Sequence, residues 1–209
     1  MAKEIYIVGT GGLAKEIAFI IDSIKDFKLG GFISNELKVG ETVYKSFSVL
    51  GDDTYATEFL KNESFFIAIG DIETRRKVVD NYKSKGIIDF PKIIHPASTV
   101  AEDVVIGEGV VVYPGSIIAT GSKIGNFSII NAHTFIGHSC RIGHFNNLSP
   151  GAIVLGDVST GHNVLIGANS SIHQSVNICS NVTIGLGSVV VSNINKKGTY
   201  FGNPAKKNI

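Results

Sequence analysis

A six-residue repeat occupies the second half of the chain and limits its fold more than any other feature. From Val100 to Val190, every sixth residue is aliphatic except Thr160, and glycine often follows directly. In an α-helix, a step of six residues turns by about 240° beyond a full turn, so these side chains would not share a face. A hexapeptide β-solenoid points each of them inward and fits small residues at its corners. The repeated positions are Val100, Ile106, Val112, Ile118, Ile124, Ile130, Ile136, Ile142, Leu148, Val154, Thr160, Ile166, Ile172, Ile178, Ile184 and Val190.

The first ninety residues follow a different period, in which strands alternate with helices. Apolar runs of strand length occupy residues 4–9, 29–34 and 65–70. Helical spacing follows over residues 13–25, through Leu13, Ile17, Ile20 and Ile24, and again over residues 72–86. Asp71 is placed to cap the second helix and Gly86 to end it. The alternation predicts a small open parallel sheet. We expect domains over residues 1–92 and 93–194, followed by a tail over residues 195–209.

The composition excludes several classes of function. A net charge of +1 offers no electrostatic basis for binding nucleic acid or an anionic membrane. The first apolar run is far too short to span a bilayer and lacks a signal-peptide cleavage pattern. The two cysteines, Cys140 and Cys179, are too few for a disulfide scaffold and are typical of a reduced, cytoplasmic protein.

The repeat resembles that of the hexapeptide-repeat acyltransferases, which fold as a left-handed parallel β-helix. The whole chain resembles one branch of them, the sialic-acid O-acetyltransferases and nucleotide-amino-sugar N-acetyltransferases, which begin with a small Rossmann-like domain. The similar segments are IYIVGTGGLAKE (5–16), FFIAIGDIETRRK (65–77), NAHTFIGHSCRIGHF (131–145) and YFGNPAKK (200–207). The resemblance implies three hexapeptides per coil, a homotrimer, and a left hand that departs from the usual preference of parallel crossovers.

Three of the six histidines, His133, His138 and His144, lie within fifteen residues of one another. In a coil of about eighteen residues, positions eighteen apart stack at the spacing of neighbouring strands, about 4.8 Å. His138 and His144 therefore lie on different faces, whereas His144 and His162 should stack. Exposed rings on a solvated face are the favoured interpretation of the stacked pair.

A metal site is the alternative interpretation of His133 and His138. Their spacing resembles that of the hexapeptide-repeat carbonic anhydrases, which bind metal between subunits. A catalytic zinc needs three protein ligands and a water. The position of that family's third histidine is Ala97 in this chain, and His95 is out of register. We therefore expect no metal.

The resemblance to the acetyltransferase branch implies that His138 is a general base, able to take a proton from a sugar amine near neutral pH. It places the backbone N–H that stabilises the oxyanion at Gly156, and a polar residue of the same cleft at Asn131. The branch usually has an acidic residue directly after the histidine, where this chain has Ser139. Asp157 lies eighteen residues after Ser139 and should stack beneath it. Our hypothesis is that Asp157 supplies the carboxylate, directly or through Ser139. The alternatives are a histidine that works without such a partner, and a slow or inactive protein.

The segment GTGGLA, residues 9–14, follows the first predicted strand and opens the first predicted helix. It matches the G-x-G-x-x-[GA] pattern, in which backbone N–H groups at a helix N-terminus suit a phosphate. An NAD site would also want an acid at the end of the second strand, about 20 residues further on. The chain offers Ser34 and Asn35 there, with Glu36 just beyond, so dinucleotide binding is disfavoured. A glycine turn needed only for tight strand–helix packing is a further alternative.

The resemblance to this branch implies that the loop binds a nucleotide-sugar substrate. The residues implied are Gly9, Gly11, Gly12 and Leu13 near the phosphates or sugar, Ser34 and Asn35 near the base, and Gly70, Asp71 and Arg75 closing the pocket. Many relatives have a histidine where this chain has Leu13. They also have acidic residues that contact the nucleobase where this chain has Ser34 and Asn35. These departures leave the base and the sugar open.

The resemblance also implies acetyl-CoA as co-substrate, bound in a groove between neighbouring subunits. The implied contacts are Asn147, Gly156, Ala168, Gly185, Leu186, Pro204 and Lys206. A solvated pair is the slightly favoured interpretation of Lys206 and Lys207. The function expected is acetyl transfer from acetyl-CoA to the amine of a nucleotide-linked 4-amino-4,6-dideoxy sugar, for surface glycan synthesis. The alternatives are a hydroxyl acceptor such as sialic acid, a zinc lyase, and a non-catalytic nucleotide-sugar-binding protein.

Overall fold

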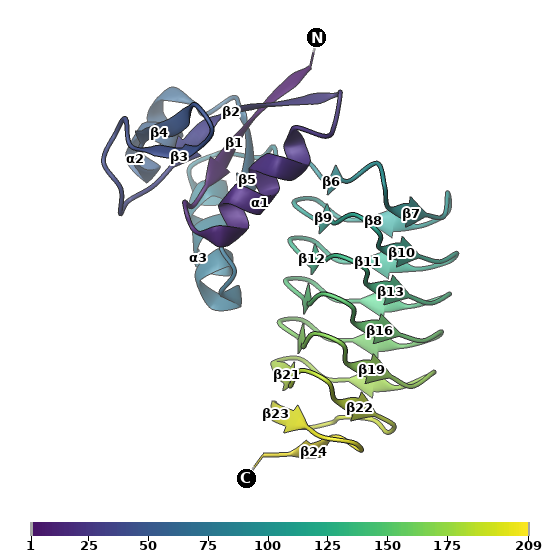
Figure 1. Ribbon diagram of the computed structural model, residues 1–209. Coiled ribbons are helices and arrows are strands. Elements are labelled where there is room, and N and C mark those ends of the chain that lie inside the picture. The colour runs from purple at the N-terminus through teal and green to yellow at the C-terminus, as the bar shows by residue number, and fades with distance from the viewer. Residues whose placement is uncertain (1, 209) are drawn as a thin grey trace. The chain divides into compact units, whose positions relative to one another are not determined.

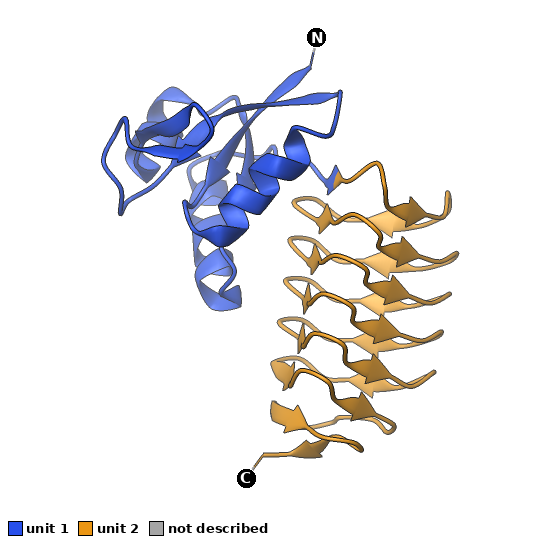
Figure 2. Cartoon of the chain, viewed as in Figure 1, with its two compact units in different colours: residues 1–93 blue, residues 94–209 orange. Residues whose placement is uncertain are grey.

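The computed structural model describes residues 2–208 and divides the chain into two compact units, Met1–Ile93 and Ile94–Ile209 (Figure 2). The first unit holds β1 (Lys3–Val8), α1 (Gly12–Ile21), β2 (Phe27–Ile33), β3 (Thr42–Tyr44), β4 (Phe47–Gly51), α2 (Asp53–Phe59), β5 (Ser64–Ile67) and α3 (Ile72–Ser84). The predicted Rossmann-like character of this unit is confirmed.

The sheet of the first unit has the strand order β3-β4-β2-β1-β5. β1 pairs in parallel with β2 and β5, and β4 pairs in parallel with β2. β3 pairs antiparallel to β4, so the prediction of a wholly parallel sheet is wrong at this edge. A turn of two residues joins β3 to β4, and so short a connection permits only an antiparallel pair.

The helix ends follow the local chemistry of the sequence. The carboxylate of Asp71 accepts a 2.8 Å hydrogen bond from the Thr74 N–H and caps α3, as predicted. Gly86 follows α3 with φ +87°, a conformation that favours glycine, and also agrees with the prediction. α1 ends at Ile21, earlier than predicted, because the N–H groups of Ser23 and Ile24 bond three residues back in a tighter turn.

The second unit is a triangular solenoid of stacked coils (Figure 1). Its first sheet holds β7 (Thr99–Val100), β10 (Ile117–Ile118), β13 (Phe135–Ile136), β16 (Ile153–Val154), β19 (Ser171–Ile172) and β22 (Val189–Val190). Its second sheet holds β8 (Val105–Ile106), β11 (Lys123–Ile124), β14 (Arg141–Ile142), β17 (Ser159–Thr160) and β20 (Asn177–Ile178). The third holds β6 (Ile93–Ile94), β9 (Val111–Val112), β12 (Ile129–Ile130), β15 (Asn147–Leu148), β18 (Leu165–Ile166), β21 (Val182–Ile184), β23 (Gly198–Phe201) and β24 (Lys206–Lys207).

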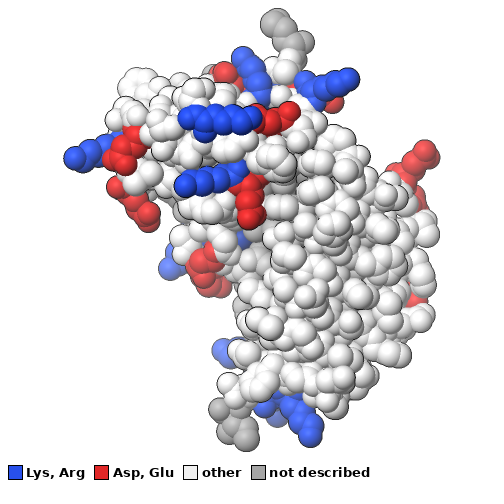
Figure 3. Space-filling model, in the orientation of Figure 1, with Lys and Arg blue, Asp and Glu red and all other residues white. Residues whose placement is uncertain are grey.

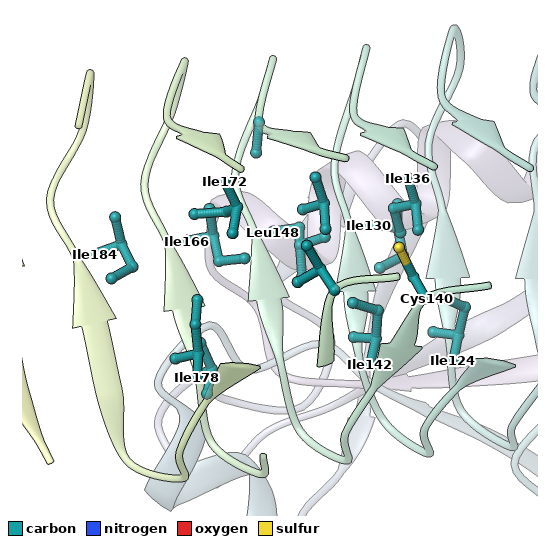
Figure 4. Close-up of a cluster of buried hydrophobic side chains, with 14 of the residues drawn as sticks. Ile124, Ile130, Ile136, Cys140, Ile142, Leu148, Ile166, Ile172, Ile178 and Ile184 are labelled. Atoms are coloured by element: carbon teal, nitrogen blue, oxygen red, sulfur yellow. The ribbon is translucent and has the colours of Figure 1, made fainter. Parts of the chain in front are cut away.

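Strand pairing confirms the predicted coil of eighteen residues, since Ile118 lies beside Ile136 and Ile136 beside Val154. From Val112 to Val190, every sixth side chain is buried inside the triangle, and Figure 4 shows several of them stacked. Val100 and Ile106 are half-buried because their strands end the first and second sheets.

Serine hydroxyls at the corners join successive coils. Ser122 Oγ donates a 2.8 Å hydrogen bond to the Gly137 carbonyl and accepts one of 3.1 Å from the Cys140 N–H. Ser170 bonds the Gly185 carbonyl and the Ser188 N–H in the same way. The small residues four positions after each anchor therefore satisfy backbone groups as well as filling space.

The tail continues the third sheet. β23 pairs in parallel with β21, and β24 turns back antiparallel to β23. Among the described residues, none of the helices has the length and apolar character needed to cross a bilayer.

Candidate functional site

His138 lies at a corner of the solenoid, directly after β13. The buried Ile136 fixes the end of the strand and Gly137 follows it. Ser139 then takes a left-handed conformation, with φ 59°, that turns the chain toward β14. The His138 side chain remains 54% exposed, so its imidazole is open to a substrate.

Gly156 lies beneath the His138 ring, one coil further on. A Cβ at residue 156 would come within 2.4 Å of His138 Nε2 and 2.6 Å of Cε1. No side chain fits there while the ring keeps its place. Glycine at residue 156 therefore makes room for the histidine.

The two corners stack as predicted. Asp157 has φ 59°, the same as Ser139, and its backbone N–H bonds the His138 carbonyl at 2.9 Å. Asp157 Oδ2 lies 3.9 Å from His138 Nδ1, and Ser139 Oγ lies 3.5 Å from the same nitrogen. The carboxylate is near enough to pair with a protonated ring, but the direct hydrogen bond is not closed in this structure.

Charge is scarce around this corner. Over residues 142–195, Asp157 is the only Asp, Glu, Lys or Arg. The Gln174 side-chain amide donates to Asp157 Oδ2 at 3.5 Å. Just before this segment, Arg141 donates a 2.8 Å hydrogen bond to the carbonyl of Gly121, so a cation also lies near the corner.

Two backbone N–H groups beside the ring are open. At the next corner of the coil, His144 Nδ1 accepts the Asn126 N–H at 2.9 Å, and His162 Nδ1 accepts the His144 N–H at 3.0 Å. Each histidine there accepts a hydrogen bond from the backbone N–H eighteen residues before it. Residue 156 has no side chain to do this, and within residues 2–208 no group accepts the N–H of His138 or of Gly156.

His144 and His162 have a structural role in the solenoid. The rings of His144 and His162 stack, with centroids 4.8 Å apart, as predicted. Their Nδ1 atoms are engaged by backbone N–H groups, so the stacked pair is part of the corner structure. The described residues contain no cluster of three or more His, Cys, Asp or Glu that would hold a metal ion.

A cavity of about 480 Å³ opens in the first unit, at the carboxyl ends of β1, β2 and β5. β2 lies on one side of β1 and β5 on the other, and ligands bind at this kind of reversal in open α/β sheets. Of the predicted substrate residues, Gly9, Gly11, Gly12, Leu13, Ser34, Asn35 and Gly70 line the cavity. Asp71 and Arg75 are not among its lining residues.

The N-terminus of α1 faces this cavity without a cap. Gly11 at the N-cap offers no side-chain hydrogen bond, and the first turn of α1 has no acidic residue. By contrast, Asp52 caps α2 and Asp71 caps α3, and each of these helices has an acid in its first turn. The open N–H groups and positive end of α1 are suited to an anion such as a phosphate.

The loop glycines have different roles. A Cβ at Gly9 would come within 2.9 Å of the Ala68 carbonyl oxygen, so this glycine permits the close approach of β1 and β5. A Cβ at Gly11 or Gly12 would meet no atom within 4 Å. Close packing, here between two strands, therefore explains Gly9 alone, and the other two glycines leave space in the cavity.

Arg75 supports the cavity wall from behind. The side chain is buried, and its guanidinium donates hydrogen bonds to the carbonyls of Ile69, at 2.7 Å, and Gly70, at 3.2 Å. Burial lowers the pKa of Arg75 to about 10. Hydrogen bonds from the Thr74 hydroxyl and N–H lower the pKa of Asp71, whose carboxylate is occupied in capping α3. Both residues shape the loop that ends at Gly70.

Asp53 also lines the cavity, and the sequence reasoning missed it. It is the first residue of α2, a helix that was not predicted. The signal that locates it is the pair Asp52–Asp53 directly after the apolar run of β4, which is a helix-start pattern.

The residues implied for acetyl-CoA lie mainly along the third sheet and its tail. Asn147 belongs to β15, Gly185 and the 81% exposed Leu186 follow β21, and Lys206 belongs to β24. Ala168 follows β18 and Pro204 precedes β24. Asn131, which the resemblance implied for the cleft of His138, follows β12 of the same sheet. His138 and Gly156 instead follow strands of the first sheet. Within one chain these two groups lie at different corners of the triangle.

Comparison with known proteins matches both units. Residues 4–82 match the family described as the PglD N-terminal domain. UDP-N-acetylbacillosamine N-acetyltransferase from Bacillus subtilis (strain 168) is 30% identical over 112 residues, covering 52% of this chain and 50% of that protein. The match thus spans about half the length of this curated relative.

Two solved structures resemble nearly the whole chain. The acetyltransferase domain of PglB from Neisseria gonorrhoeae FA1090 is 28% identical, with a TM-score of 0.89 over 99% of this chain and 100% of that one. A variant of perosamine N-acetyltransferase from Caulobacter crescentus, in complex with CoA and GDP-perosamine, is 28% identical, with a TM-score of 0.90 over 98% of this chain and 96% of that one.

A Rossmann-like unit followed by a left-handed parallel β-helix, with an exposed histidine at a corner, is the architecture of the hexapeptide-repeat acyltransferases. Within that class, the proteins that the chain resembles are nucleotide-amino-sugar N-acetyltransferases, in agreement with the resemblance drawn from its sequence.

Proposed function

We propose that this protein transfers the acetyl group of acetyl-CoA to the amine of a nucleotide-linked 4-amino-4,6-dideoxy sugar. The observation that carries the proposal is the exposed His138 ring seated on Gly156, beside two open backbone N–H groups. A base next to oxyanion donors is what acyl transfer to an amine requires. The cavity at the uncapped end of α1 supports a phosphate-bearing acceptor.

In the proposed reaction, the sugar amine attacks the thioester carbonyl while His138 Nε2 takes a proton from its nitrogen. A C–N bond forms and the carbonyl π pair becomes an oxyanion, to which the Gly156 N–H donates. The tetrahedral intermediate then collapses, the C–S bond breaks, and CoA leaves as the thiol after receiving the proton from His138. The products are the acetamido sugar and free CoA.

Asp157 is proposed to orient His138 and to stabilise its protonated form. Ligand binding would close the 3.9 Å gap to Nδ1, or Ser139 Oγ would bridge it. Catalytic hydrogen bonds are often long before the substrate arrives. The carboxylate would then hold the proton on Nδ1 and leave Nε2 free to accept another.

The positions of the two residue groups support a homotrimer. The acetyl-CoA residues follow the third sheet and His138 follows the first, so a complete site needs a neighbouring subunit that brings one corner against the other. Figure 3 shows few charged side chains on the visible face of the solenoid. Burying such a surface against another subunit costs little free energy of desolvation. Asn131 and Lys206 would contribute at this interface.

The same proposal extends to the setting of the enzyme. A cytoplasmic location and a role in surface glycan synthesis suit a nucleotide-linked substrate and a CoA donor. The relatives act on, or bind, nucleotide-linked amino sugars as their names state, which supports the amine as acceptor. A hydroxyl acceptor such as sialic acid is the second candidate, because the same base would activate it.

The first test is CoA release from acetyl-CoA with UDP-, dTDP- and GDP-linked 4-amino-6-deoxy sugars and with sialic acid. The wild type and His138→Ala are compared, with His144→Ala as a matched control at the neighbouring corner. We expect the wild type and His144→Ala to turn over an amino sugar, and His138→Ala to lose that turnover. Turnover with sialic acid alone would move the assignment to O-acetylation, and silence with nucleotide still bound would leave a non-catalytic protein.

A further inference from the structure

Asp53 lies at the same edge of the sheet as the glycine loop. β4 pairs in parallel with β2, and β2 in parallel with β1, so the carboxyl ends of these strands meet there. α2 begins at Asp53, two residues after β4 ends, and its carboxylate reaches the cavity that Gly11, Gly12 and Ser34 also line. Asp53 thus adds a second acid to this cavity, which Glu36, just beyond the end of β2, also lines.

Two neutral donors hold the carboxylate in position. The Tyr82 hydroxyl donates to Oδ1 at 2.7 Å, and the Asn35 side-chain amide donates to Oδ2 at 2.8 Å. Asn35 also accepts the Asp53 N–H at 3.1 Å. Both polar ends of the Asn35 amide therefore contact Asp53, so this residue holds the carboxylate in position.

The Asp53 carboxylate retains capacity for a ligand. A carboxylate has about four acceptor positions, and two of them are filled here. Among residues 2–208, no Lys, Arg or His forms an ion pair with Asp53. Burial, and the hydrogen bond to Asp53, raise the pKa of Tyr82 far above its usual value, so Tyr82 stays a neutral donor.

A second hollow adjoins the first and indicates where each part of a nucleotide fits. It has a volume of about 550 Å³, shares Ser34 and Asn35 with the first cavity, and extends to Leu37, Val39, Leu50 and Tyr55. Phosphates belong at the end of α1, since the negative Asp53 repels them. A planar base fits the apolar side chains of the second hollow, which Lys38 and Asp52 also line. The ribose then falls between them, beside Asp53.

We propose that Asp53 accepts hydrogen bonds from the ribose hydroxyls of the substrate nucleotide, so that the site selects a ribonucleotide over its 2′-deoxy form. The proposal rests on the proposed function and narrows its substrate class. A 2′-deoxyribose leaves part of a partly buried carboxylate without a donor, and an unpaired polar group of this kind lowers affinity.

The test is isothermal titration calorimetry of the full chain with UDP, dUDP, GDP, dGDP and inorganic pyrophosphate. The variants are Asp53→Asn, which keeps the size of the side chain, and Glu58→Gln, which removes the same charge from the exposed side of the same helix. We expect the wild type to bind one ribonucleoside diphosphate about tenfold more tightly than its 2′-deoxy form, the effect of one hydrogen bond to a charged group. Asp53→Asn should lose that preference and bind pyrophosphate at least as tightly as the wild type, while Glu58→Gln keeps the preference.

Equal affinity of the wild type for the ribo and deoxy forms would overturn the proposal, as would an undiminished preference in Asp53→Asn. Absence of nucleotide binding would overturn it as well. The CoA-release assay separates this outcome from the fate of the proposed function. If the protein prefers the ribonucleotide but releases no CoA, the Asp53 proposal stands and the proposed acetyltransferase activity is contradicted. A protein that turns over a dTDP-sugar best retains the acetyltransferase and loses the Asp53 proposal.

Discussion

The His138 ring occupies the space that a side chain at residue 156 would fill, with Nε2 only 2.4 Å from the position of a Cβ on Gly156. One residue choice therefore does two things in the solenoid. It leaves room for the imidazole. It also removes the side chain that would otherwise accept a hydrogen bond from the His138 N–H, as His162 does from the His144 N–H. The base and its neighbouring donors come from the same local packing.

Gly156→Ala is expected to displace the His138 ring and to lower kcat/KM by about 100-fold, since a shift of about 1 Å at a reacting group has that effect. The measurement is steady-state CoA release, paired with thermal unfolding. Gly161→Ala is the matched control, because its Cβ would come within 2.4 Å of Ser180 Oγ at the next corner. It should lose stability and keep its turnover. Equal loss of turnover in both variants would assign Gly156 a structural role alone.

Asp157→Asn should lower kcat by about tenfold or more, the cost of one charge-assisted hydrogen bond to a protonated ring. KM for the acceptor should stay unchanged, because Asp157 is proposed to act through His138 and not on the substrate. The pH profile of kcat should also shift, which a purely structural role would not produce.

Asp103→Asn is the control for that variant. Asp103 occupies the same corner position three coils earlier, where its carboxylate accepts hydrogen bonds from the Thr120 hydroxyl, at 2.7 Å, and the Gly121 N–H, at 2.9 Å. It should retain full turnover. Ser139→Ala then separates a direct pairing from a bridged one, because only a bridge through Ser139 Oγ makes that variant slow. Full activity in Asp157→Asn contradicts the hypothesis.

Asp71→Ala should destabilise the first unit by about 1 kcal/mol through loss of the α3 N-cap. The hydrogen bonds from Thr74 lower the folded-state pKa of Asp71 below its unfolded value. The stabilisation is therefore fully present above the unfolded pKa and is lost as pH falls through the folded pKa. Chemical denaturation of the two proteins at neutral and acidic pH measures this, and the difference between them should shrink in acid. A constant difference across that range would assign the effect to something other than the ionised cap.

The sequence predicted the parts of the molecule that rest on long periodic patterns. Sixteen anchors at a fixed spacing leave few alternatives, so the coil, its buried core and the stacking of His144 on His162 followed from counting residues. Asp53, and its contact with the predicted Asn35, were beyond that reasoning. Their contact joins the end of β2 to the start of α2, across strands that are not adjacent in the chain, and a seven-residue helix has too few turns to show a helical period.

The same limit applies to the catalytic corner. Spacing placed Ser139 over Asp157, but it gave no sign that Nδ1 would lie 3.5 Å from Ser139 Oγ and 3.9 Å from Asp157 Oδ2. Those distances depend on side-chain rotation, whereas the six-residue repeat fixes only the positions of the backbone. Arg75 shows the converse. The family resemblance implied that it closes the substrate pocket, whereas its side chain is buried and its guanidinium bonds two backbone carbonyls.

Thr160 breaks the aliphatic series, and its surroundings show why. Its hydroxyl accepts hydrogen bonds from the Asn146 amide at 2.6 Å and from the Gly143 N–H at 3.1 Å, and all three groups are buried or partly buried. Asn146 also donates to the Gly161 carbonyl and accepts the Val164 N–H. This polar network replaces the aliphatic contact that the repeat supplies at the other fifteen anchors.

Thr160→Val restores the repeat and is nevertheless expected to destabilise the solenoid by about 1–3 kcal/mol, because it leaves the Asn146 and Gly143 donors buried without an acceptor. Asn146→Val in the same chain removes one of those donors, but it also leaves the Val164 N–H and the Gly161 carbonyl without their partner. The double variant should therefore be less stable than Thr160→Val, and its loss should be smaller than the sum of the two single losses. A double-mutant cycle by thermal unfolding measures the coupling. Ile142→Val, at the anchor one coil earlier in the second sheet, measures the cost of a small change in core volume. A Thr160→Val variant more stable than the wild type would mean that hydrophobic packing at this anchor outweighs the network.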